Sequence, residues 1–366
     1  MRSLRTLTKN PCNHNAFLTG VLLLAASQAA TAQCIVCPLH PAASSESYGL
    51  GSSNGQSAGY ARIGSQFRAS WWNGTAESWI DLSPTVASDS FAYGASGNRQ
   101  VGWATINGSN RASAWAGTAA SWVNLNPAAA FESYAFGVSG NQQVGLAIVG
   151  NSSRASLWSG SAASWIDLNP IGSSYSVAFS TCVTQQAGTA RVNNIDRASI
   201  WSGSAESWVD LNPAGAVGSA AYGTHGGRQV GYATINNRNR ASLWAGTAES
   251  WLDLSPAGAS ASSAYGTFAN QQVGEATIDG ISRASLWSSS AESWTDLHAM
   301  LPSHFQSSVA QSIWSDTTAI YISGSGYNTL THRSEALLWT QPIPTPSAAA
   351  TLILTSATLV ARRRKR

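Results

Sequence analysis

Carboxylates and histidines that stand outside any repeating pattern are the residues of this chain that could perform acid–base chemistry. They are Asp89, Glu132, Asp196, Glu275, Asp279, Asp316, His225, His298, His304 and His332. Hydrolysis of a glycosidic bond, for example, needs two carboxyl groups that flank the bond. In the sequence these residues are scattered over different repeats, so solvated surface is their ordinary interpretation. We therefore expect no catalytic residue, no cofactor site and no metal site.

Another set of charged residues recurs every 43 residues and belongs to a repeating unit. The repeated arginines are Arg68, Arg111, Arg154, Arg197, Arg240 and Arg283. Two tryptophan series, which begin at Trp72 and Trp79, keep the same interval. Six copies without net insertion or deletion indicate a repeat protein. Because a catalytic group is needed once, these residues are interpreted as framework.

An acidic residue follows most of the repeated arginines and is their predicted partner. The pairs are Arg68 and Asp81, Arg154 and Asp167, Arg197 and Asp210, Arg240 and Asp253, and Arg283 and Asp296. On an antiparallel hairpin the two members lie on one face, because side chains alternate along each strand. Asn124 takes the acidic position beside Arg111. An amide can accept a hydrogen bond, which favours a structural role over proton transfer.

Each unit consists of four short segments that alternate apolar and polar residues and are separated by Gly, Asn, Ser or Pro. In one copy they are 220–223, 228–235, 240–244 and 250–254. This pattern is typical of antiparallel strands. Four strands per 43-residue period predict an all-β fold, a β-propeller of four-stranded blades. Because neighbours cover both faces of a blade, Leu243 should pack on one face and Trp244 on the other, and Leu252 should share a face with Leu254. A glycine after a strand valine, as in Val230-Gly231, indicates a bulge or a close backbone approach.

The number of blades follows from the two ends of the repeat region. The segment 307–339 is a degenerate seventh copy that lacks its last strand. The stretch 34–37 could supply that strand and close the ring. Seven blades are therefore expected within a domain of residues 33–341, and six blades with spare strands are the alternative.

Charge is concentrated at the chain termini. Of 20 basic residues, eight lie in the first nine and last five positions, which leaves 12 arginines against 17 acidic residues in the body. A nucleic-acid-binding domain would carry a basic patch on its folded body. The sequence therefore excludes nucleic acid as a partner.

The N-terminus has the order of a secretory signal peptide. A basic start leads into the apolar run 16–26 and then into small residues before a cleavage point between Ala32 and Gln33. Residues 1–32 are predicted to be removed on export; an uncleaved N-terminal anchor is the alternative. Export makes a disulfide feasible, and Cys34 and Cys37 could close on each other, whereas Cys182 is expected to be an isolated thiol.

Residues 342–366 carry a second targeting pattern. Pro344, Thr345, Pro346 and Ser347 precede the apolar stretch 348–361 and a basic end, the arrangement of a stop-transfer segment. This order resembles the PEP-CTERM sorting signal of Gram-negative bacteria, although Thr345 stands where that motif has Glu. The resemblance implies an exosortase-type processing enzyme as a partner and transient anchoring in the inner membrane. A plain tail anchor is the alternative.

The repeat itself, with its order Ala-Tyr-Gly, Gln-Val-Gly, Arg-Ala-x-x-Trp and Asp-Leu, is similar to the HAF-type extracellular repeats of bacterial secreted proteins. Arg-Ala-Ser takes the place of His-Ala-Phe. The resemblance covers residues 48–340 and implies export and a propeller-like fold, but no defined activity.

From these observations we expect an exported, non-catalytic protein of the cell surface or extracellular matrix. The resemblance to exosortase substrates implies exopolysaccharide as its partner. The alternative is a propeller-type carbohydrate-active enzyme, a glycoside hydrolase or lyase.

Overall fold

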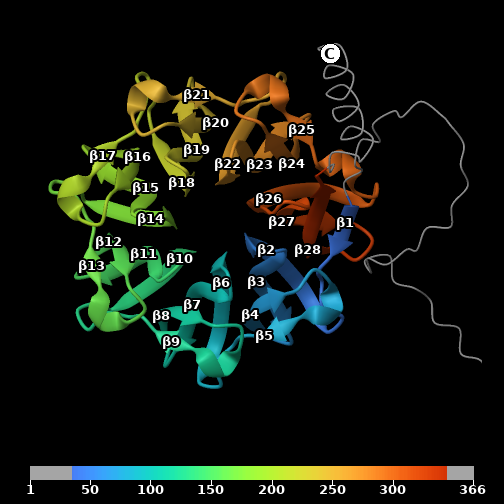
Figure 1. The fold of residues 1–366 in the computed structure, drawn as a ribbon, viewed down its shortest axis with the longest axis horizontal. Helices are drawn as coiled ribbons and strands as arrows, with labels where there is room; N and C mark the ends of the chain where they lie inside the picture. Colours follow the sequence, from blue (N-terminus) through green and yellow to red (C-terminus); the bar gives the residue numbers. More distant parts are fainter. Residues whose placement is uncertain (1–34, 344–366) are drawn as a thin grey trace, which may run out of the picture.

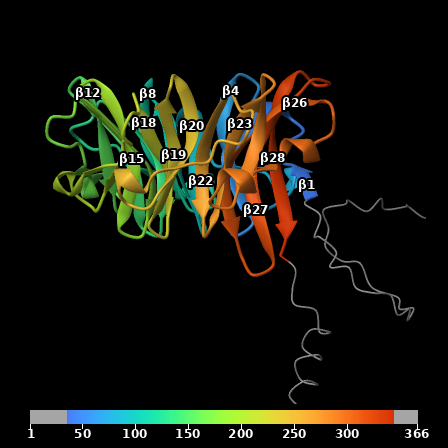
Figure 2. The same ribbon diagram turned by 90° about the horizontal axis from the view of Figure 1, so that it is seen from above.

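The computed structural model describes residues 35–343, which form seven four-stranded antiparallel sheets around one central axis (Figure 1). Seen from the side, the sheets stand like blades in a flat disc (Figure 2). The described residues are thus a seven-bladed β-propeller. The prediction of an all-β propeller with seven blades is confirmed, and the alternative of six blades is wrong.

Each of the first six blades is built from four consecutive strands, with the first strand nearest the axis. Blade 1 has β2 (Ser44–Ser53), β3 (Gln56–Ile63), β4 (Gln66–Trp72) and β5 (Ile80–Asp81). Blade 2 has β6 (Ala87–Ser96), β7 (Arg99–Ile106), β8 (Ser109–Trp115) and β9 (Val123–Asn124). Blade 3 has β10 (Glu132–Ser139), β11 (Gln142–Val149), β12 (Ser152–Trp158) and β13 (Ile166–Asp167).

The same plan continues around the ring. Blade 4 has β14 (Tyr175–Cys182), β15 (Gln185–Val192), β16 (Ile195–Trp201) and β17 (Val209–Asp210). Blade 5 has β18 (Ser219–His225), β19 (Arg228–Ile235), β20 (Arg238–Trp244) and β21 (Leu252–Asp253). Blade 6 has β22 (Ala261–Phe268), β23 (Gln271–Ile278), β24 (Ile281–Trp287) and β25 (Thr295–Asp296). Short 3₁₀ helices connect the two outer strands of these blades and follow β25: η1 (Ala76–Ser78), η2 (Ala119–Ser121), η3 (Ala162–Ser164), η4 (Ala205–Ser207), η5 (Ala248–Ser250), η6 (Ala291–Ser293) and η7 (His298–Met300).

Blade 7 joins the two ends of the described chain. It has β26 (Phe305–Ser315), β27 (Ala319–Asn328) and β28 (Arg333–Pro342), and its outer strand is β1 (Ile35–Pro38). Strand β1 pairs antiparallel with β28, with Val36 opposite Trp339 (Figure 1). The N-terminal stretch therefore supplies the missing strand, as predicted. Cys37, in this strand, is disulfide-bonded; its expected partner Cys34 lies outside the described residues.

One buried serine per blade links neighbouring sheets by a hydrogen bond. The Ala112 N–H donates to Ser133 Oγ at 3.0 Å, and the Ala155 N–H donates to Ser176 Oγ at 2.8 Å. Equivalent bonds occur at every junction, including the one from the Ala336 N–H to Ser47 Oγ that joins blade 7 to blade 1. These bonds satisfy backbone groups that burial would otherwise leave unpaired.

The hydrophobic core is divided among the junctions between blades. Trp158 of blade 3 is fully buried and clusters with Val101 and Leu125 of blade 2. Tryptophans at the equivalent positions fill the other junctions. Because a buried aromatic side chain removes a large apolar area from water, these tryptophans are major contributors to stability. The predicted interlocking of tryptophans with aliphatic residues is present.

The outermost strand departs from the expected packing. It contains only two residues in each of the first six blades, and in blade 5 Leu252 is 51% exposed whereas Leu254 is fully buried. The expectation that these two leucines share a covered face is wrong, because the strand ends before Leu254 and its free edge faces solvent.

Among the described residues, no helix has the length and apolar character needed to cross a membrane. The apolar stretch 348–361, for which such a role was predicted, lies outside them.

Candidate functional site

A β-bulge interrupts the innermost strand of every blade at the same position. In blade 5 the pairing of β18 with β19 shifts between Ala221 and Gly223, which leaves Tyr222 unpaired. The bulged residues are Leu50, Tyr93, Phe136, Phe179, Tyr222, Tyr265 and Gln311, in blade order. Because a bulge redirects a side chain, it places one residue of each blade at the axis.

A glycine on the neighbouring strand makes each bulge feasible. A Cβ atom on Gly231 would lie 1.8 Å from the Ala220 carbonyl oxygen, and one on Gly59 would lie equally close to that of Tyr48. Only a residue without a side chain fits at this distance. The repeated Val-Gly is therefore a close backbone approach, which was one of its two predicted meanings.

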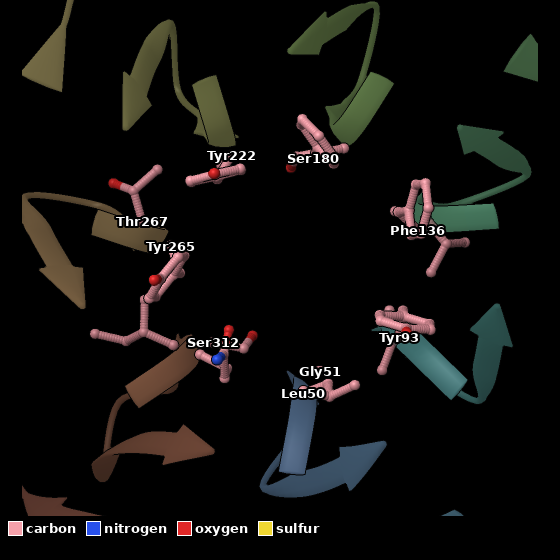
Figure 3. Close-up of a pocket in the computed structure, with 18 residues that line it drawn as sticks. Leu50, Gly51, Tyr93, Phe136, Ser180, Tyr222, Tyr265, Thr267 and Ser312 are labelled. Atoms are coloured by element: carbon pink, nitrogen blue, oxygen red, sulfur yellow. The ribbon is translucent and has the colours of Figure 1, made fainter. Parts of the chain in front are cut away.

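The bulged residues line an axial cavity of about 430 Å³. Figure 3 shows Tyr93, Phe136, Tyr222 and Tyr265 around this central opening, with Ser180 and Ser312 beside them. No residue lining the cavity carries a charge. The cavity is therefore suited to a neutral ligand.

Five consecutive bulged residues form a continuous arc of aromatic rings on one side of the cavity. Ring centroids of successive members, from Tyr93 through Phe136 and Phe179 to Tyr222 and Tyr265, are 5.2 to 5.8 Å apart. These spacings are favourable for aromatic pairs. The arc is interrupted by Leu50 and Gln311, so the cavity has an aromatic side and a mixed side.

Burial changes the acidity of the tyrosines in this arc. The pKa values of Tyr93, Tyr222 and Tyr265 are raised above their ordinary value near 10, chiefly because desolvation disfavours the phenolate. For Tyr265 the nearby Glu275 carboxylate raises the pKa further. At neutral pH these phenols are protonated and can donate hydrogen bonds.

A smaller cavity of about 250 Å³ adjoins the axial one. Tyr222 and Tyr265 line both, and Tyr232, Asn239 and Glu275 are among the other residues that line the smaller one. The Tyr265 hydroxyl donates to Glu275 Oε1 at 2.6 Å. Glu275 is the charged residue of this lining.

The repeated arginines and aspartates lie away from these cavities. The five predicted pairs are all present, with Nη1–Oδ2 distances of 2.6 to 3.3 Å. None of these residues lines the axial cavity. Arg111 does not bind Asn124, and its Nη1 instead donates to the Phe131 carbonyl at 3.2 Å.

The scattered acids do not converge on one place. Asp89 accepts the Phe67 N–H, Asp196 pairs with Arg191, and Asp316 binds the Thr318 N–H in its own turn. Within residues 35–343, no group of three or more His, Cys, Asp or Glu side chains could hold a metal ion. Cys182 is a free, half-buried thiol.

Several predicted processing residues lie outside the described part of the chain. They are Ala32 and Gln33 at the signal cleavage point, and Pro344, Thr345, Pro346 and Ser347 of the sorting motif.

Sequence reasoning did not find the axial residues. The sequence motif that could have indicated them is Ala-Tyr-Gly, as at Ala92-Tyr93-Gly94, but the motif was used only to identify the repeat. The middle residue of that motif is the one that the bulge turns to the axis.

Comparisons with known proteins identify the fold. Neither the protein-family models nor the curated proteins include a match to this chain. Among solved structures, puromycin hydrolase is similar with a TM-score of 0.52 and 10% identity, over 79% of this chain and 53% of that one. The β-propeller domain of the Trilobed protease from Pyrococcus furiosus gives 0.49 and 9%, over 82% and 99%. Pyrococcus horikoshii acylaminoacyl peptidase gives 0.46 and 9%, over 85% and 54%. The chain thus spans about half the length of puromycin hydrolase.

These comparisons correct the expected function. The solved structure that shares the fold with a TM-score above 0.5 is that of a hydrolase, puromycin hydrolase. The expectation of a non-catalytic matrix protein bound to exopolysaccharide is therefore wrong for this propeller. At 10% identity the likeness shows the fold alone, and some of the proteins that share it are enzymes.

Proposed function

We propose that this propeller is the substrate-binding unit of a peptidase-like system and that its axial cavity takes a neutral, apolar peptide segment. The observation that carries the proposal is the arc of five aromatic residues in an uncharged cavity. The propeller fold that the chain shares with puromycin hydrolase supports it. The proposal assigns binding to the propeller and bond cleavage to a second domain or chain.

The aromatic side of the axial cavity suits the side chains of a peptide, and its mixed side suits the peptide backbone. The aromatic arc offers apolar area to aromatic or aliphatic side chains. On the opposite side, the Gln311 side-chain amide has no hydrogen-bond partner among residues 35–343, so it can bind a peptide group. Ser312 Oγ accepts the Ser52 N–H at 3.0 Å and keeps its own O–H for a ligand.

Binding of a capped peptide by the full chain tests the proposal. The probe is an acetylated and amidated tripeptide of Phe and Leu, which carries no charge, and calorimetry measures its Kd. Because an aromatic contact at the centre of a binding site contributes strongly, Phe136→Ala should weaken binding at least about 10-fold. Phe131→Ala is the matched control, since Phe131 is 69% exposed and does not line the axial cavity. Equal affinity in both variants, or no binding of any capped apolar peptide, would contradict the proposal.

We also propose that the chain is exported and then processed at its C-terminus by an exosortase-type enzyme. The support is the sequence of the two ends. Mass spectrometry of the native protein should show loss of residues 1–32 and of the segment after about residue 342. An intact C-terminus would contradict processing.

A further inference from the structure

Glu275 occupies a position of the repeat where the preceding five blades carry no charge. It follows the glycine that faces the bulge, and the equivalent residues are Tyr60, Trp103, Leu146, Thr189 and Tyr232. Glu275 is thus a charged residue at a position that the first five blades fill with uncharged side chains.

The charge of Glu275 is not balanced within residues 35–343. Its oxygens accept hydrogen bonds from the Tyr265 and Ser282 hydroxyls. No ion pair of the described residues includes it. Its surface is only partly exposed. A half-buried carboxylate without a cation is costly, and a bound cation would offset that cost.

The surroundings of Glu275 are those of a cation site. Three tyrosine rings, Tyr222, Tyr232 and Tyr265, line the same cavity of about 250 Å³. Aromatic faces attract ammonium groups, and a carboxylate binds them through charge-assisted hydrogen bonds. Asp196 also lies near Tyr232, but Arg191 binds both of its oxygens at 2.7 and 2.8 Å. Glu275 is thus the uncompensated anion of this cavity.

We propose that Glu275, with Tyr222, Tyr232 and Tyr265, binds a primary ammonium group of the ligand. The assignment to a peptide ligand rests on the function proposed above. Because Tyr222 and Tyr265 line both cavities, a peptide in the axial cavity can place its ammonium group against Glu275. That group is either the peptide N-terminus or a lysine side chain, which share this chemistry.

A small probe tests the site without any peptide. The full chain is titrated with n-butylammonium and with n-butanol, and NMR chemical shifts measure binding. Butylammonium should bind the wild type, and Glu275→Gln should weaken it about 10- to 100-fold, the range of a charge-assisted bond. Glu292→Gln is the control, since Glu292 is exposed on η6 of the same blade and has no ion pair. Equal binding of butylammonium and butanol, or no effect of Glu275→Gln, overturns the proposal.

Peptides then identify the source of the ammonium group. A free N-terminus is compared with its acetylated form, and an acetylated peptide with lysine is compared with one that has norleucine. The pair that shows an affinity gain abolished by Glu275→Gln identifies the source. If neutral capped peptides bind but neither pair shows a gain, the ammonium site is wrong and the peptide function stands. If no capped peptide binds while butylammonium still depends on Glu275, the peptide function is wrong and the ammonium site stands.

Discussion

The residues that join the blades and the residues that line the axis vary in opposite ways. At the junctions, the same tryptophan, leucine and serine recur from blade to blade. At the bulge, one position reads Leu, Tyr, Phe, Phe, Tyr, Tyr and Gln around the ring. The same backbone arrangement therefore occurs in all seven blades, and it presents four kinds of side chain, Leu, Tyr, Phe and Gln, to a ligand.

The difference extends along the innermost strands. Three residues after the bulge, blades 1 to 3 carry Ser53, Ser96 and Ser139, each of which accepts an N–H of the next blade. Blades 5 to 7 carry His225, Phe268 and Trp314 at this position, with neighbouring rings 4.4 and 6.4 Å apart. At this position of the innermost strand, blades 5 to 7 are therefore aromatic and blades 1 to 3 are not. A ligand at the axis would contact an asymmetric set of side chains, although the backbone around it is nearly symmetric.

Trp158→Ala tests the junction residues and should have the largest effect. Trp158 is fully buried between blades 2 and 3. Its truncation should lower the free energy of unfolding by about 3–5 kcal/mol, through lost burial and the cavity left behind. Denaturant unfolding of the full chain measures this change. We call the residues at the junctions between blades the frame. A loss below about 1 kcal/mol would contradict the division between this frame and the residues that line the axis, since Trp→Ala at a true core site costs more.

Gly231→Ala tests the close approach that permits the bulge. The added methyl group would meet the Ala220 carbonyl oxygen at 1.8 Å, so the backbone must shift at a cost of about 3 kcal/mol. Gly218→Ala is the matched control, because its Cβ would be no nearer than 3.8 Å to any neighbour and its φ is not in the left-handed region. Thermal unfolding compares the two. Similar melting temperatures would show that the glycine is dispensable and that the bulge has another cause.

The frame could be predicted from the sequence because its signals are periodic. Arg197 and Asp210 repeat with the tryptophans, and alternation along two strands places the pair on one face. A count of the strands indicated the stretch 34–37 as the closing strand, and the structure has this strand at Ile35–Pro38. Leu252 was misplaced, because alternation cannot show where a strand ends and its edge meets solvent.

The axial site could not be predicted in the same way. At a bulge the alternation fails by one residue, so the direction of Tyr222 cannot be read from strand periodicity. Glu275 stood out only as an irregular acid. Its tyrosine neighbours come from two blades. Tyr265 lies on the strand that pairs with the strand of Glu275, whereas only the assembled ring brings Tyr222 and Tyr232 of blade 5 to it.

Tyr265→Phe tests whether a buried tyrosine of the axial cavity makes the stability of the protein depend on pH in the alkaline range. The folded state raises the pKa of Tyr265, so above pH 10 the unfolded chain loses a proton that the folded chain keeps. Stability should therefore fall as pH rises above about 10, with a slope of up to about 1.4 kcal/mol per pH unit for this tyrosine. Melting temperatures between pH 8 and 11 should fall less steeply in Tyr265→Phe. If the melting temperatures of variant and wild type fall in parallel with pH, the Tyr265 phenol has the same pKa in the folded and the unfolded chain, which contradicts the prediction.

Arg197→Ala tests the repeated ion pair and should have the smallest effect. Arg197 Nη1 lies 2.6 Å from Asp210 Oδ2, but the two side chains are 23% and 31% exposed. Solvent therefore screens the pair, and the loss should be about 0.5–1 kcal/mol.

The chain supplies its own control for this ion pair. Arg111 occupies the same position but has Asn124 instead of a carboxylate, and it binds only the Phe131 carbonyl. Arg111→Ala should therefore lower the melting temperature less than Arg197→Ala, and 1 M NaCl should reduce the difference, since salt screens exposed charges. If both variants lose the same stability in low and high salt, the arginine acts through its aliphatic stem and the ion pair contributes nothing to the frame.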